Sequence, residues 1–428
     1  MRKSGTAITS NMHPERQIQQ ENLRRFMKTG KKIRSPSYTL KASKMRILQM
    51  AKLFRKAYEK EAVVAWRSPF VPTEIFYALD IIPLCIEAFS SMLAGSLLSA
   101  KTLDSADDAF YSRDVCSFLR CAVGAAREDY LPTPDFLVCT SHYCDSGGKT
   151  FDNLAKKYKK PYFFLDTPYH YNDKVAVDYL AKQLEDMVKE LEKIIGRKMN
   201  PDKLAETIKL SNEAREYFLK VNELRKNIPS PMLGSEAIDY AAIVANTWGT
   251  RETIDVYKTL YEELKERVEK QVDAVEGEQY RILWRHLRPY YDIGIMSYLE
   301  NQCKMAIAFE EINYIYWKEM DPKDPYRSLS QKLLSNSPIG PIEHWTKEAT
   351  LNFVNWYKID GIIEFAHWGC RHLNSAAHIL RDELQKIGKP FLVLDGDCID
   401  DRNYAVAQTS ARIDAFLNSL ENQIAVIK

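Results

Sequence analysis

Short apolar runs bounded by polar turns alternate along this chain with longer amphipathic stretches. The runs expected to form strands are 62–66, 81–86, 135–139 and 162–166 in the first half, and 280–285, 305–310, 361–366 and 391–395 in the second. Such alternation is typical of parallel strands joined by crossover helices. The pattern therefore predicts an α/β fold.

A long helical region separates the two groups of strands. From about 173 to 276, charged residues interleave with Leu, Val, Ile and Tyr at helical spacing, and few Gly or Pro interrupt them. A chain of 428 residues also exceeds the usual size of one core. We expect a basic, mostly helical extension (1–60), a first α/β domain (61–200), a helical linker region (201–278) and a second α/β domain (279–428).

The two halves resemble each other weakly. KPYFFLD at 160–166 is matched by KPFLVLD at 389–395, and the strand upstream leads to Cys144 in the first copy and to Cys370 in the second. Any two strand–helix–strand units share apolar strands, but that alone does not place a cysteine in the same loop of both copies. We interpret the halves as a pseudo-repeat.

Composition and charge restrict the partners of the chain. Hydrophobic residues make up 45% and charged residues 28%, values typical of a compact globular protein, and the net charge of +2 gives no reason to expect a nucleic acid. Residues 1–45 carry eleven Lys and Arg against Glu15 and Glu21. We interpret them as a solvated, partly helical extension rather than an arm that docks on an anion.

We expect a cytoplasmic location. The chain has no apolar segment of the kind a signal peptide needs, and no run of about 18 apolar residues that would indicate a membrane span. In a reducing compartment eight cysteines are not expected to form disulfides, so they bind metal or fill the core. Two Cys-x4-Cys spacings, Cys116 with Cys121 and Cys139 with Cys144, leave both possibilities open.

Position along the strands favours metal binding for some of these cysteines. Cys139, Cys144 and Cys370 fall at predicted carboxyl ends of strands, where doubly wound sheets build their binding sites. Cys116 precedes a helix-like run. A helix N-terminus lowers the pKa of a thiol and favours the thiolate that iron needs.

A competing motif overlaps these positions. DSGGKT at 145–150 ends like a phosphate-binding loop, and FFLD at 163–166 resembles a magnesium-binding strand end. Tyr143 occupies the place of the first glycine, and the twin strand ending at Asp395 has no Gly-Lys-Thr beside it. We keep a P-loop nucleotide-binding module, or a non-catalytic scaffold, as an alternative.

Larger motifs resemble a known family. The segment 63–83, VVAWRSPFVPTEIFYALDIIP, is similar to the opening motif of 2-hydroxyacyl-CoA dehydratase and benzoyl-CoA reductase subunits. DVC at 114–116, the segment 144–168 and the block 361–402 resemble later motifs of that family in the same order. The resemblance spans about 55–425. It implies two flavodoxin-like domains around an iron–sulfur cluster, which a separate ATP-hydrolysing 4Fe–4S activator supplies with electrons.

One departure from the family concerns the cluster. Ser68 stands where the dehydratases usually place a cluster cysteine, whereas Cys121 and Cys139 are additional. Such a surplus resembles the double-cubane branch, which implies an 8Fe–9S cluster, with 4Fe–4S as the alternative. The implied ligands are six cysteines, with Cys85 and Cys398 as substitutes for the sixth: Cys116, Cys121, Cys139, Cys144, Cys370 and Cys303.

Reduction of a substrate also requires protons. His142, His367, His372 and Glu364 lie beside the expected ligand loops and are candidate proton donors. The alternative for the histidines is that they bind loop backbone and orient the cysteines. Glu364 and Asp145 share this ambiguity, since a carboxylate buried near a cluster would have a perturbed pKa.

The resulting hypothesis is an oxygen-sensitive, homodimeric reductase of anaerobic metabolism. It would accept low-potential electrons from the activator and reduce a small unsaturated molecule. The first alternative is a 2-hydroxyacyl-CoA dehydratase, which is a lyase, or a benzoyl-CoA reductase subunit that acts on a CoA thioester together with a different subunit.

Overall fold

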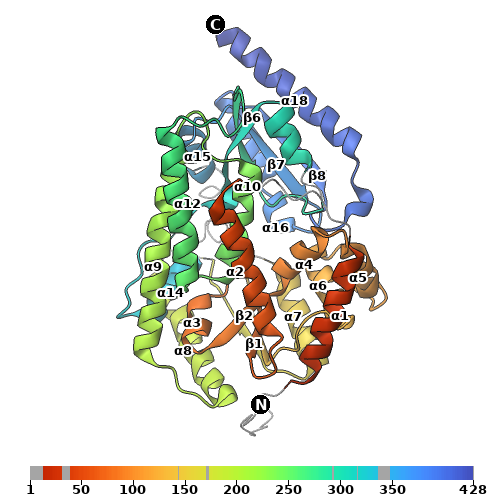
Figure 1. The fold of residues 1–428 in the computed structure, drawn as a ribbon, viewed down its shortest axis with the longest axis vertical. Coiled ribbons are helices and arrows are strands. Elements are labelled where there is room, and N and C mark those ends of the chain that lie inside the picture. The colour runs from red at the N-terminus through yellow and green to blue at the C-terminus, as the bar shows by residue number, and fades with distance from the viewer. Residues whose placement is uncertain are drawn as a thin grey trace.

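Two four-stranded parallel sheets form the framework of the protein (Figure 1). The computed structural model describes residues 13–30, 39–142, 144–169, 173–291, 294–315, 317–335 and 348–427. The first sheet has the order β2-β1-β3-β4, with β1 (Val63–Arg67), β2 (Ile81–Cys85), β3 (Phe136–Thr140) and β4 (Tyr162–Leu165). The second has the order β6-β5-β7-β8, with β5 (Tyr280–Arg285), β6 (Met305–Glu310), β7 (Gly361–His367) and β8 (Phe391–Gly396).

All eight strands occur where the apolar runs predicted them, and the α/β class is confirmed. Each order corresponds to the first four positions of the flavodoxin order 2-1-3-4-5. The two sheets share one topology, as the pseudo-repeat predicted. Both first strands also end in Trp-Arg, at Trp66-Arg67 and Trp284-Arg285.

Burial explains why these segments are strands. Every residue of the central strands β1, β3, β5 and β7 is buried, as expected for parallel strands covered on both faces, and so is every residue of the edge strand β6. One apolar cluster contains residues of both sheets, including Trp66 and Trp284. The two sheets therefore share a hydrophobic core.

Helices cover the faces of both sheets. Those associated with the first sheet are α3 (Thr73–Ala78), α4 (Ile86–Ala94), α5 (Ser99–Asp107), α6 (Ser117–Arg127), α7 (Asp145–Tyr158) and α8 (Lys174–Ile195). Those of the last third of the chain are α13 (Gly294–Ser297), the π-helix Tyr298–Gln302, α14 (Pro325–Leu334), α15 (Thr350–Trp356), α16 (Arg371–Asn374), α17 (Ala377–Lys386) and α18 (Val406–Ile427). Short 3-10 turns span Ile238–Tyr240, Glu311–Asn313 and Asp401–Asn403.

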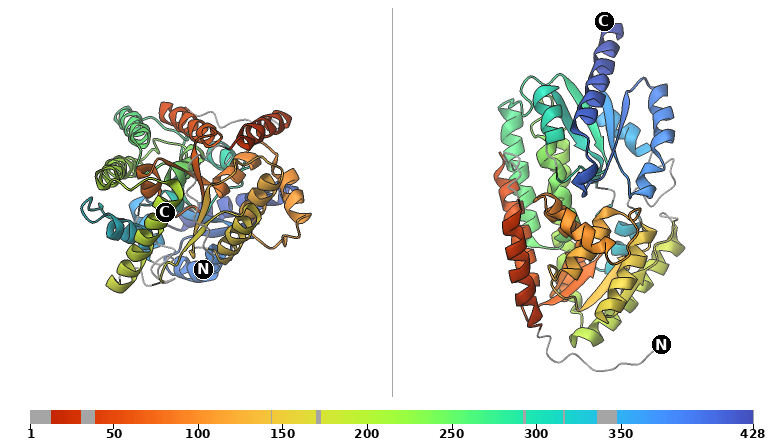
Figure 2. Two further views of the ribbon diagram at one scale, coloured as in Figure 1. Left: turned by 90° about the horizontal axis from the view of Figure 1, so that it is seen from below. Right: turned by 90° about the vertical axis from the view of Figure 1, so that its right-hand side faces the viewer.

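A layer of long helices runs along both sheets, as Figure 2 shows from the side. The long helices are α2 (Lys41–Ala57), α9 (Pro201–Leu224) and α12 (Arg251–Glu269), and two short helices, α10 (Gly234–Ala237) and α11 (Ala241–Asn246), lie between α9 and α12 in sequence. The 24 residues of α9 span about 36 Å, enough to reach from one sheet to the other. Near the middle of α9 Ser211 binds Glu74 of α3, and just beyond its carboxyl end Arg225 pairs with Glu310 of β6.

The chain also crosses back between the sheets. Helix α14 follows the second sheet's β6 in sequence, yet it packs against α8 on the first sheet, with Leu329 and Leu333 in the same apolar cluster as Val63. This crossing was not part of the partition expected from sequence. In the described residues, no helix is both long and apolar enough to span a membrane.

The amino-terminal helix α1 (Glu15–Thr29) is not the solvated extension that the charge pattern indicated. Arg16 is fully buried, pairs with Asp135 at 2.8 Å, and donates to the carbonyl oxygen of Thr133. Burial raises the pKa of Asp135, but His13 and Arg16 outweigh it and hold that pKa below its usual value. Phe26 stacks on Tyr130. The helix is therefore part of the first α/β unit.

Arg16→Met should lower the free energy of unfolding by about 3 kcal/mol, because it leaves the buried carboxylate of Asp135 without its guanidinium partner. Urea denaturation measures the change. The matched control is Arg24→Met, whose side chain is 71% exposed and whose loss should cost less than about 0.5 kcal/mol. Equal losses in the two variants would show that α1 does not dock in solution.

Candidate functional site

Three partly exposed cysteines lie at the carboxyl edges of the sheets, each as the residue that precedes a helix. Cys144 precedes α7 after β3, Cys370 precedes the single turn α16 after β7, and Cys116 precedes α6. These loops come from both α/β units. All three thiols are free, and the first turns of α6 and α7 favour negative charge at Cys116 and Cys144.

The loops carrying Cys116 and Cys370 pack directly against each other. A Cβ atom placed on Gly369 would lie 2.5 Å from the Cα atom of Cys116, closer than any real Cβ contact. Position 369 therefore needs glycine. The close approach brings a cysteine of the first unit beside the cysteine-bearing loop of the second.

His367, the last residue of β7, connects the same two loops. Its Nδ1 accepts a hydrogen bond from the backbone N–H of Cys398 at 3.2 Å, and its Nε2 lies 3.4 Å from the Sγ of Cys116. Because Nδ1 is an acceptor, the neutral ring carries its proton on Nε2 and donates it to the sulfur. Burial lowers the pKa of His367, so the ring is neutral at pH 7. This arrangement orients Cys116 and favours its thiolate.

Five thiols interact electrostatically. Cys116 interacts with Cys370 and Cys144, Cys398 interacts with Cys116 and Cys370, and Cys139 interacts with Cys144. Burial raises the pKa of Cys370 to about 11 and that of Cys139 to about 12. It raises the pKa values of Cys116 and Cys398 well above the usual value. An electropositive group at this position would be needed to hold them as thiolates.

The remaining cysteines lie elsewhere. Cys121 is buried within α6, with its sulfur 3.0 Å from Thr102 on α5, so it faces the packing between those helices. Cys303 precedes β6 and therefore lies at the amino edge of the second sheet, where it contacts Tyr298 and interacts with Asp414. The expectation that Cys303 reaches the site is wrong, because parallel strands place it at the edge opposite Cys370. Cys85 ends β2, buried, 3.7 Å from Glu87.

The candidate proton donors are also near these loops. The ring centroids of His142 and His372 lie 5.4 Å apart, so the two rings connect the loop after β3 with α16. Burial lowers the pKa of His142 to about 4. Burial raises the pKa of Glu364 on β7, although Arg285 lies 3.7 Å away and opposes this shift. Asp145 is exposed in the first turn of α7.

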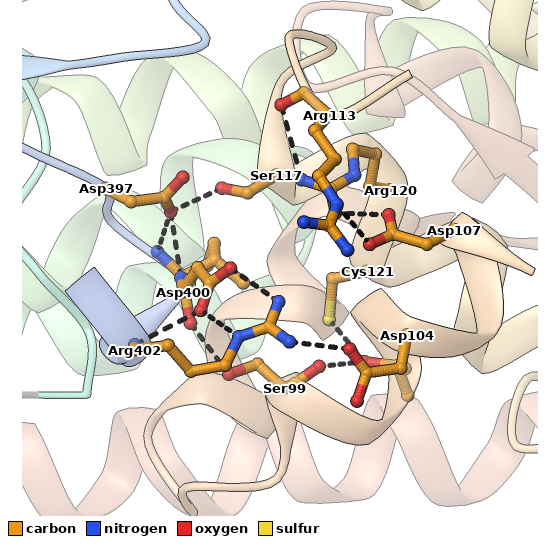
Figure 3. Close-up of polar contacts among 12 residues, drawn as sticks. Ser99, Asp104, Asp107, Arg113, Ser117, Arg120, Cys121, Asp397, Asp400 and Arg402 are labelled. Atoms are coloured by element: carbon orange, nitrogen blue, oxygen red, sulfur yellow. Dashed lines mark hydrogen bonds and ion pairs between the residues drawn. The ribbon is translucent and has the colours of Figure 1, made fainter. Parts of the chain in front are cut away.

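Polar contacts beside Cys116 join the two units (Figure 3). Ser117 donates to Asp397 at 2.6 Å, and the hydroxyl of Ser99 donates to the carbonyl oxygen of Ile399 at 2.7 Å. Arg402 binds both Asp400 and Asp104, which lies on α5. The loop after β8 is thereby attached to α5 and α6, and it carries Cys398.

The thiols do not form a preassembled site for a single metal ion. Within the described part of the chain, no three Cys, His, Asp or Glu side chains already converge on one point as a mononuclear site requires.

Comparison with known proteins identifies the family. The profile of the family described as "2-hydroxyglutaryl-CoA dehydratase, D-component" matches residues 69–420. The chain belongs to this family. It is 25% identical to the (R)-phenyllactyl-CoA dehydratase alpha subunit of Clostridium sporogenes, over 87% of this chain and 92% of that protein. It is 24% identical to a benzoyl-CoA reductase subunit of Thauera aromatica, over 83% of this chain and 89% of that protein.

The structure does not favour the P-loop alternative. Helix α7 begins at Asp145, so Gly147 and Gly148 are helical rather than part of a loop that could wrap around phosphates. Lys149 is exposed on this helix, and Asp166 accepts a hydrogen bond from Tyr179. Tyr143, which replaces the first glycine, lies outside the described residues.

Sequence reasoning underrated Cys398. It follows β8 by two residues, buried beneath the His367 ring that binds its backbone N–H. A usable signal existed, because the pseudo-repeat ends β4 and β8 at matching positions and so places Cys398 just past a carboxyl end. In this family member the second unit therefore contributes two neighbouring thiols, Cys370 and Cys398.

Thiol labelling of cluster-free protein under native conditions should modify Cys116, Cys144 and Cys370 first, because only these three are partly exposed. The five buried cysteines, at most 5% exposed, should react after unfolding in urea: Cys85, Cys121, Cys139, Cys303 and Cys398. Timed alkylation with peptide mass spectrometry measures the order. Native-state labelling of Cys121 or Cys398 at the rate of Cys144 would contradict the arrangement.

Proposed function

We propose that this chain is an iron–sulfur reductase component that receives low-potential electrons from a separate ATP-hydrolysing iron–sulfur activator and passes them to a small unsaturated substrate. The supporting observation is the group of five thiols at the facing carboxyl edges of the two sheets, where the Gly369 contact and the hydrogen bonds of His367 bring Cys116, Cys370 and Cys398 together. One cubane needs three or four cysteine ligands, so five favour a double cubane over a single 4Fe–4S cluster.

The proposed ligands are Cys116, Cys139, Cys144, Cys370 and Cys398. The last replaces Cys303 of the sequence-based set, and Cys121 drops out because it faces α5. Cys85 ends β2 at the same edge but lies in register with Arg67, on the sheet face opposite Cys139, so we do not propose it as a sixth ligand. A cluster held here would supply one-electron transfer at low potential.

The protein's own groups would hold and tune this centre. His367 donates to the Cys116 sulfur, and such hydrogen bonds raise the reduction potential of iron–sulfur clusters. We therefore propose that His367 is a positioning residue and not a proton donor. His142 and His372 remain the candidates for proton delivery.

A second function is favoured by the relatives. Four of them are alpha subunits of 2-hydroxyacyl-CoA dehydratases, and two different subunits of benzoyl-CoA reductase also match. A dehydratase or aryl-CoA reductase component would use a 4Fe–4S cluster together with a different subunit. Iron content and dependence on a CoA thioester distinguish this function from the first.

Cysteine variants test the ligand set. Cys116→Ser, Cys370→Ser and Cys398→Ser should each lose most of the visible absorbance and iron of anaerobically purified protein, because each removes a thiolate from the interacting group. Cys303→Ser is the matched control and should keep the wild-type iron content. Wild-type iron content in Cys398→Ser would show that Cys398 is not a ligand and would leave the three partly exposed cysteines as the proposed ligands. Iron-free wild-type protein after anaerobic reconstitution would refute the cluster.

ATP dependence tests the division of labour. Supplied with dithionite and Mg-ATP, the chain alone should show neither ATP hydrolysis nor substrate reduction, because α7 offers no phosphate-binding loop. Addition of an activator of the family type should start both, with acetylene as the first substrate and an acyl-CoA panel beside it. We propose a homodimer that would match a two-fold activator. ATP hydrolysis by the isolated chain that Lys149→Ala abolishes would support the P-loop alternative instead.

A further inference from the structure

Equivalent arginines end the first strand of each sheet, and their surroundings differ. In the second sheet Arg285 of β5 lies in register with Glu364 of β7, and it binds Glu311, which follows β6, at 3.2 Å. Both neighbours are carboxylates. The positive charge of this buried side chain is therefore compensated from both sides.

In the first sheet the two flanking carboxylates are missing. Arg67 of β1 lies in register with Cys85 of β2 and with Val138 of β3. Its guanidinium is fully buried, and Nη1 donates to the carbonyl oxygens of Ser68 and Pro69, at 2.8 and 3.1 Å. The Nε and Nη2 atoms have no hydrogen-bond partner among the described residues.

Within the part of the chain that the structure describes, no nearby carboxylate replaces them. Glu74 is held by Lys332 and Ser211, at 2.5 and 2.7 Å. Glu87 accepts from the Cys85 thiol at 3.7 Å and makes no hydrogen bond to Nε or Nη2 of Arg67. A buried guanidinium without a hydrogen-bonded counter-charge is strongly unfavourable. The buried guanidinium of Arg67 therefore lacks a counter-ion within the first sheet, and a bound anion would supply one.

The two unpartnered atoms indicate which anion. Nε–H and one Nη2–H are parallel and coplanar, and together they form the fork that binds both oxygens of one carboxylate. Glu87 and Glu74 also interact with Arg67 and disfavour a ligand with more than one negative charge. Pro69 and Glu87 are the partly exposed neighbours, so they mark the side from which a ligand reaches the guanidinium.

We propose that Arg67 is the binding site for the carboxylate group of a small molecule at the carboxyl edge of the first sheet. Arg67 shares a sheet face with Val63 and Val138, whereas Cys139 points to the other face. The site is thus separate from the five thiols and extends beyond the proposed function. It does not require a cluster.

Acetate and acrylate are the probes, with inorganic phosphate as the dianion and constant chloride throughout. Calorimetry on the protein as isolated should show saturable binding of the two carboxylates and much weaker binding of phosphate. Arg67→Met should weaken carboxylate binding by about tenfold or more, the loss expected for charge-assisted hydrogen bonds.

The pseudo-repeat provides a matched pair of variants. Val138→Glu places a carboxylate where Glu364 stands beside Arg285, so it should compensate Arg67 internally and weaken acetate binding to the same extent. Val138→Gln has the same size without the charge and should stay within about threefold of wild type. Circular dichroism checks that each variant folds, and Arg67→Met alone carries the test if neither substitution at Val138 is tolerated.

Several results would overturn the site. These are acetate binding unchanged in Arg67→Met, equal binding by Val138→Glu and Val138→Gln, tighter binding of phosphate than of acetate, or no binding to wild type. The iron content of the same preparations is measured in parallel. If wild-type protein contains iron but does not bind acetate, this site alone is refuted. If it binds acetate but contains no iron, only the cluster is refuted.

Discussion

The contact between Cys116 and Gly369 is the constraint on which the site depends. It brings the carboxyl edge of the first sheet against that of the second so closely that a single methyl group at position 369 would separate them. Two side-chain contacts beside the thiols also connect the two units. His367 reaches from β7 to the Cys116 sulfur, and Ser117 reaches from α6 to Asp397. A cluster-type ligand set shared by two units needs this degree of fixation, because its sulfurs must keep their spacing.

The long helices also help to fix the position of one sheet relative to the other. Helix α9 is anchored to α3 through Ser211 and Glu74, and the residue after it pairs with Glu310 at the end of β6. Helix α14 returns to the first sheet and packs on α8. Movement of one sheet relative to the other would break buried polar contacts in this layer as well as in the loop after β8. The facing edges are therefore held on two sides.

The pseudo-repeat shows how two copies of one fold take on different roles. Both sheets have the same strand order, and both first strands end in Trp-Arg. Around Arg285 the second sheet places two glutamates, which neutralise it and leave a structural ion pair. Around Arg67 the first sheet places Cys85 and Val138 instead. The exchange of two side chains in register turns a closed ion pair into a cation without a hydrogen-bonded counter-charge.

The sequence by itself determined the strands, the class and the family, because strand and helix periods are local and the order of motifs is read directly from the chain. It also placed Cys116, Cys144 and Cys370 correctly at helix starts. Only the tertiary structure decided which thiols meet. Cys398 joins them through the His367 loop, Cys303 lies at the opposite sheet edge, and Cys121 turns toward α5. The charge pattern also predicted a solvated amino-terminal segment, whereas the structure buries Arg16 against Asp135. Such outcomes depend on register and on tertiary contacts between residues 19 to 119 positions apart, which no local pattern encodes.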